Sequence, residues 1–71
     1  MSTMQSTPIY VVYVRSAIYG YIVKYRPFLD VDEAHEWLSI QSMHYSVPKG
    51  EGNVWEGDTY TVGIETWSVA S

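Results

Sequence analysis

The stretch from Arg26 to Ser42 (RPFLDVDEAHEWLSIQS) most constrains the fold, because it alone carries a complete helix signature. Asp30 occupies an N-cap position, Glu33 follows three residues later as in a capping box, and Pro27 closes the preceding strand. A helix of about a dozen residues is marginal alone in water, so we expect it to pack on the strands that flank it. The two sides of the helix are an apolar face with Val31, Ala34, Trp37 and Leu38, and a polar face with Asp32, His35, Glu36 and Ser39.

Two segments before this helix are rich in Val, Ile and Tyr, which favours a β-hairpin. They span Pro8 to Val14 and Ala17 to Tyr25, with a polar break between them. If the loop is Ser16-Ala17, Tyr13 lies across from Gly20 and the faces of the hairpin separate. The face expected to receive the helix then carries Tyr10, Val12, Val14, Tyr19, Tyr21, Val23 and Tyr25. The outward face carries Ile9, Val11, Tyr13, Ile18 and Ile22 together with Arg15, Lys24 and Arg26.

The segments after the helix predict more strands. Met43 to Val47 alternates weakly as a short strand would, and 48–52 (PKGEG) has the composition of a loop. A second hairpin is expected from Val54-Trp55, through a turn at 56–58, to the run 59–69. Its two sides are Tyr60, Val62 and Ile64 on one, and Thr61, Gly63, Glu65 and Trp67 on the other.

These elements predict an α+β fold with a small antiparallel β-sheet and one amphipathic helix packed on one face. The expected order is ββαβ(β). We expect residues 1–7 to form a disordered N-terminal tail and 8–71 to form a single α+β domain.

The composition narrows the class of protein. The chain has 71 residues, no cysteine and a net charge of -4, which disfavours a disulfide scaffold and direct binding of nucleic acid. No apolar run approaches the roughly 20 residues of a membrane span. We therefore expect a cytoplasmic protein without membrane contact. The charge is divided, because the residues before Asp30 carry three basic groups while all eight carboxylates lie at or after it.

Motifs for catalysis are absent from the sequence. His35 and His44 are candidates for acid-base or metal chemistry, but they are nine residues apart without a matching third ligand. The glycines match neither a phosphate loop nor a dinucleotide fingerprint. We expect no enzyme activity, no cofactor and no metal. A small metal-dependent hydrolase using His35, Glu36 and His44 is the remote alternative.

Aromatic residues are the most distinctive part of the composition, with seven Tyr, three Trp and one Phe. Tyr and Trp combine a large contact area with a polar group and are enriched at interfaces. We expect Tyr21, Tyr25 and Trp37 to fill the core. We expect Tyr13, Trp55 and Trp67 to lie on outward faces or loops and to contact a partner.

The layout of a tyrosine-rich hairpin followed by a Pro-Phe-x-x-x-x-Glu-Ala-x-x-Trp-Leu helix resembles that of several small phage and mobile-element proteins. The residues concerned are Pro27, Phe28, Glu33, Ala34, Trp37 and Leu38, within residues 9 to 42. Anti-CRISPR inhibitors, often single acidic α+β domains of this size, are among those proteins. The resemblance transfers no functional residue. It implies an inhibitor that occludes a nucleic-acid-binding surface on a host defence complex.

The sequence therefore predicts a small acidic, non-enzymatic interaction module, which we interpret as an inhibitor of the anti-CRISPR type that acts in a host cytoplasm. Its partner would be a protein with a basic surface, such as a CRISPR or other nucleic-acid-handling complex. The alternative is a structural or regulatory homodimer, such as an antitoxin-like or virion accessory protein. The carboxylates expected to contact the partner, or else merely to keep the protein soluble, are Asp30, Asp32, Glu33, Glu36, Glu56 and Asp58.

The outward face of the first hairpin predicts homodimerisation. Alternate residues of a strand point to opposite sides, so one helix cannot cover both faces of the hairpin. A second copy would cover the exposed one. The alternative is that the C-terminal hairpin folds over this face with Tyr60, Val62 and Ile64 as a lid. The expected dimer interface is Ile9, Val11, Tyr13, Ile18 and Ile22.

Overall fold

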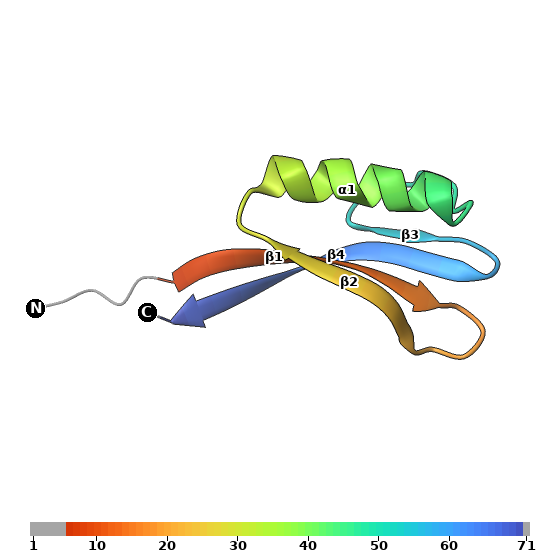
Figure 1. Cartoon of the computed structure of the whole chain (residues 1–71), viewed down its shortest axis with the longest axis horizontal. Helices are drawn as coiled ribbons and strands as arrows, with labels where there is room; N and C mark the ends of the chain where they lie inside the picture. Colours follow the sequence, from red (N-terminus) through yellow and green to blue (C-terminus); the bar gives the residue numbers. More distant parts are fainter. Residues whose placement is uncertain (1–5, 71) are drawn as a thin grey trace, which may run out of the picture.

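The computed structural model describes residues 6 to 70, which form a four-stranded antiparallel sheet with one helix packed on one face (Figure 1). The elements are β1 (Ser6–Ser16), β2 (Ile22–Phe28), α1 (Val31–His44), β3 (Val54–Glu56) and β4 (Tyr60–Ala70). The predicted α+β class is confirmed, with the order ββαββ. Of the expected N-terminal tail, residues 1–5 lie outside the described residues, whereas Ser6 and Thr7 belong to β1.

The centre of the sheet is built from the first and the last strand. The strand order is β2-β1-β4-β3, and β1 pairs with β4 from Ser6↔Ala70 to Ser16↔Tyr60. Because β4 lies in the same sheet as β1, it cannot cover it. The expected lid is therefore wrong: the residues assigned to it, Tyr60, Val62 and Ile64, pack on the helix side with the core.

The helix begins as the sequence predicts. Asp30 has the extended backbone of an N-cap, and its carboxylate accepts a hydrogen bond of 2.8 Å from the backbone N–H of Asp32. The carboxylates of Asp32 and Glu33 in the first turn interact favourably with the helix dipole. Within residues 6 to 70 no helix combines the length and the hydropathy needed to cross a membrane.

The helix ends later than expected, and the strand predicted for Met43 to Val47 is wrong. The helix continues to His44, Tyr45 caps it, and Ser46 turns the chain with φ of 56°. The N–H of Val47 then donates to the carbonyl of Ser42 at 2.7 Å, which folds the chain back under the helix and buries Val47.

The core lies between α1 and the two central strands. Leu38 is fully buried there, and Trp55 is only 5% exposed. Trp55 pairs with Val62, so it points to the same side of the sheet as Val62, toward α1. Our expectation that Trp55 lies on an outward face or loop is therefore wrong. The core cluster consists of Val12, Val14, Ala34, Leu38, Val47, Trp55, Val62 and Ile64.

The first hairpin has a different register from the one expected. Tyr13 pairs with Tyr25, the register shifts between Val14 and Arg15, and the turn comprises residues 17–21. Gly20 lies in this turn with φ of 79°, which glycine adopts without steric cost, so it is not a strand residue opposite Tyr13.

The new register reverses the faces that we expected for β2. Lys24 pairs with Val14 and Arg26 with Val12, so both cations lie on the helix side. Tyr25 points to the other side and is 67% exposed, while Tyr21 lies in the turn and is 59% exposed. The expectation that these two tyrosines fill the core is therefore wrong. Trp37, by contrast, is half-buried and packs against the core as expected.

Candidate interaction surfaces

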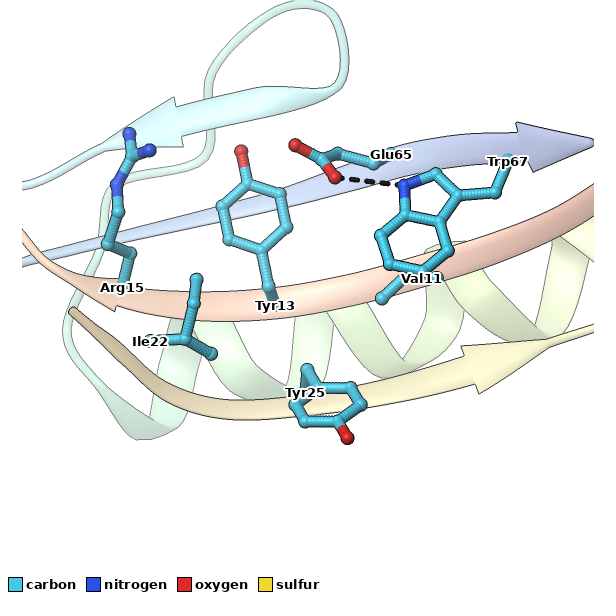
Figure 2. A pocket seen from close by; sticks show the side chains of 7 residues that line it. All are labelled: Val11, Tyr13, Arg15, Ile22, Tyr25, Glu65 and Trp67. Carbon is cyan, nitrogen blue, oxygen red and sulfur yellow. Dashed lines mark hydrogen bonds between the residues drawn. The ribbon is translucent and has the colours of Figure 1, made fainter. Parts of the chain in front are cut away.

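The face of the sheet that points away from α1, which we call the outer face, has a hollow of about 350 Å³ (Figure 2). Val11 and Tyr13 from β1 form its floor, and Ile22, Tyr25 and Trp67 surround them. Val11 is 7% and Tyr13 8% exposed, although no helix or strand of residues 6 to 70 lies over them (Figure 1). Neighbouring side chains on the same face bury them, and the hollow itself opens to solvent.

One cation and one anion flank this apolar floor. Figure 2 shows the guanidinium of Arg15 at one end and the carboxylate of Glu65 beside Trp67 toward the other. The Arg15 Cζ atom lies 5.8 Å from the centre of the Tyr13 ring. The indole Nε1 of Trp67 donates a hydrogen bond of 3.0 Å to Oε2 of Glu65, which orients both side chains. Along the strands, the apolar floor around Tyr13 therefore has a positive charge on one side and a negative charge on the other.

Most residues of the predicted dimer interface lie on the outer face. Val11, Tyr13 and Ile22 line the hollow, and Ile9 pairs with Trp67 on the same side. Ile18 is the exception, because it lies in the β1–β2 turn outside the strand, and its predicted place on the outward face is corrected. Sequence reasoning missed three other residues that line the hollow, namely Arg15 and Glu65 as a pair of charges and Tyr25 as an exposed aromatic.

The side of α1 that points away from the sheet carries a second distinctive surface. Glu36, Ile40 and Met43 follow one another at spacings of four and three residues, opposite the buried Ala34 and Leu38. Ile40 is 46% and Met43 75% exposed. Sequence reasoning missed both, although their spacing from Glu36 was a usable signal. We call the exposed row of Asp32, Glu33, Glu36, Ile40 and Met43 the helix stripe.

The six carboxylates expected to contact a partner separate into two groups. Asp30, Asp32, Glu33 and Glu36 lie at the start of α1, whereas Glu56 and Asp58 line a hollow with Tyr45, just beyond its end. Glu36 and Tyr45 are nine residues apart, which is about 13 Å along a helix axis. The structure therefore does not bring the six together into one track.

The two histidines are also separated. His35 and His44 are both exposed and lie about 13 Å apart along the helix axis. The His44 ring packs edge-on against Tyr45, with 5.1 Å between the ring centres. Among residues 6 to 70, no group of three or more His, Cys, Asp or Glu side chains gathers closely enough to hold a metal ion.

The cations of β2 have a packing role at the edge of the core. The Lys24 Nζ atom lies 5.6 Å from the centre of the Trp37 ring, and the Arg26 Cζ atom lies 5.0 Å from that of Phe28. The two aromatic rings are themselves 5.9 Å apart. Lys24 and Arg26 therefore cover the seam between helix and sheet with their side chains while their charges stay in solvent.

Comparison with protein-family models, with curated proteins and with solved structures found no match to this chain. The helix stripe and the outer face are therefore the two candidate interaction surfaces of residues 6 to 70.

Proposed function

We propose that this chain is a non-enzymatic interaction module whose helix stripe binds a basic, nucleic-acid-binding surface of a protein partner and so inhibits it. The observation that supports this proposal is the exposure of Ile40 and Met43 in line with Asp32 and Glu36. A helix face that serves only solubility needs no such apolar side chains. The stripe instead has the pattern of a helix that lies in a groove of another protein.

The two halves of the stripe would make different contributions to binding. The carboxylates at the start of α1, in a chain with a net charge of -4, attract a cationic surface and speed the encounter at low salt. Ile40 and Met43 would then lose their exposed apolar area to the partner, which stabilises the complex by up to about 1.5–3 kcal/mol for each fully buried side chain. Affinity should therefore fall, without vanishing, as salt is raised.

The test is a pull-down from bacterial lysate with the immobilised full chain, at low and at physiological salt. We expect recovery of a nucleic-acid-handling complex, and loss of that complex with Glu36→Lys or Ile40→Ser. Glu51→Lys is the matched control, because it makes the same charge change at an exposed loop residue outside the helix stripe. Recovery of no such complex, or equal recovery with Glu36→Lys and Glu51→Lys, would count against the proposal.

A structural or regulatory homodimer is the second candidate function, favoured by the hollow on the outer face. The two proposals use opposite sides of the molecule, since the helix stripe and the outer face are separated by the sheet (Figure 1). Each is therefore testable without the other.

A further inference from the structure

The outer face carries more exposed apolar surface than a solvated sheet face usually does. In an antiparallel sheet with one face on a core, the other face normally alternates to polar residues. Here Ile22 is 49%, Trp67 56% and Tyr25 67% exposed, and they surround a floor of Val11 and Tyr13. Apolar side chains gathered in this way mark a surface that another molecule covers.

We propose that this molecule is a second copy of the chain, and that two sheets pack by their outer faces in a symmetric dimer. The proposal rests on the homodimer candidate above, for which it specifies the interface, and it does not depend on the function of the helix stripe. In such a dimer both helices face outward, so each copy keeps its stripe free.

The positions of the two charges support a two-fold arrangement. Along the paired strands, Tyr13↔Gly63 lies midway between Arg15↔Thr61 and Val11↔Glu65. Consider a two-fold axis that lies in the interface, runs perpendicular to the strands and crosses them at the level of Tyr13. This axis places the level of Arg15 in one copy opposite the level of Glu65 in the other. Arg15 of each copy then approaches Glu65 of the other, which gives two equivalent ion pairs. A symmetric interface requires such self-complementarity, because the same patch must serve on both sides.

The hollow gives the interface its shape. Packed sheets lie about 10 Å apart with their side chains interdigitated, and they leave few voids larger than a water molecule. A hollow of about 350 Å³ must therefore receive side chains from the other copy. Tyr25 and Trp67 on the rim are large enough and exposed enough to enter it.

The area of the outer face is sufficient for a reversible dimer. β1 and β4 are each 11 residues long. This length corresponds to about 36 Å, and the 7 residues of β2 correspond to about 23 Å. At about 4.8 Å per strand, the three strands offer roughly 450 Å² on each copy. The total of roughly 900 Å² is small for a specific interface, so we expect dissociation in the micromolar range.

The test is sedimentation or light scattering of the full chain at tens of micromolar. We expect twice the mass of the 8.1 kDa chain. Arg15→Glu and Glu65→Arg each place like charges opposite one another, so each alone should weaken the dimer at least roughly tenfold. An equal mixture of the two variants restores both ion pairs, and we expect it to dimerise again.

The controls keep this result interpretable. Glu36→Arg makes the same charge change on the side of α1 that points away from the sheet and should leave the dimer intact. Circular dichroism checks that each variant is folded. If a charge variant fails to fold, Tyr25→Lys replaces it, because that side chain is exposed and its substitution should also block the dimer.

A wild-type mass of one chain at these concentrations, as expected if a small ligand or the chain's own terminus covers this face, overturns the proposal. So does a dimer that is insensitive to the outer-face variants, or a mixture of folded charge variants that stays monomeric.

Discussion

The ring of Tyr13 lies against Gly63 of the neighbouring strand, so that a Cβ atom on residue 63 would come within 2.5 Å of the tyrosine oxygen and 2.7 Å of the adjoining ring carbon. Glycine at this position gives the aromatic ring the space to lie flat on the sheet. The contact explains how Tyr13 is buried on a face that no helix or strand of the described residues covers.

Gly63→Ala should therefore destabilise the protein, because the added methyl group displaces the Tyr13 ring. We expect a loss of about 1–3 kcal/mol in the free energy of unfolding, measured by urea denaturation. In a Tyr13→Leu background the same substitution should cost less, since the ring that it meets is gone. Equal costs in the two backgrounds would show that the Tyr13 ring is not what prevents a larger side chain at residue 63.

Leu38→Ala should remove much of the stability of this domain. Leu38 is fully buried between α1 and the sheet, and truncation of such a residue costs about 2–5 kcal/mol. A chain of this size has only about 4–10 kcal/mol of stability. Thermal or urea unfolding measures the loss, and Ile40→Ala on the exposed side of the same helix is the control, for which we expect a small change.

Asp30→Ala should weaken the start of α1. The carboxylate that accepts the hydrogen bond from the Asp32 N–H is lost, at a cost of about 1 kcal/mol in the free energy of unfolding. Asp30→Asn keeps an acceptor oxygen at the N-cap and should stay close to wild type. If the two variants unfold at the same urea concentration, the cap contributes nothing measurable.

Gln41→Met should stabilise the protein. Gln41 is 5% exposed on α1, and its Oε1 atom accepts no hydrogen bond from residues 6 to 70. Methionine has a similar shape without the buried polar group, so we expect a gain of about 1 kcal/mol in denaturation experiments. Ser42 provides the contrast, because its buried hydroxyl donates to the carbonyl of Ser39 at 2.8 Å. A loss of stability with Gln41→Met would indicate that the amide makes a favourable interaction.

The sequence was sufficient to predict the elements whose signals are local. The N-cap at Asp30 and the two sides of β4 followed from short-range patterns, and the structure confirms both. The end of α1 was harder, because no glycine follows His44 to mark it. Ser46 takes up the left-handed backbone there instead.

The faces of β2 were wrong because they depend on the length of a turn. We assumed a two-residue loop, whereas the observed turn has the five residues 17–21 and is preceded in β1 by a register shift between Val14 and Arg15. Because successive side chains of a strand point to opposite faces, this error in register placed Lys24 and Tyr25 on the wrong faces. For the same reason, Tyr25 was not predicted to line the hollow on the outer face. Trp55 was misplaced by a similar error, because a turn at 56–58 would pair it with Thr59, whereas the longer turn pairs it with Val62 on the helix side.

The two edge strands restrict how copies of this protein can associate. β3 has three residues, and β2 carries Pro27, which lacks a backbone N–H, together with the cations Lys24 and Arg26. Short, charged or proline-containing edges resist the addition of further strands. Association edge to edge, which would extend the sheet without limit into fibrils, is therefore disfavoured. An apolar face between two such blocked edges favours assemblies that close after a small number of copies, so concentrated protein should remain dispersed and not polymerise.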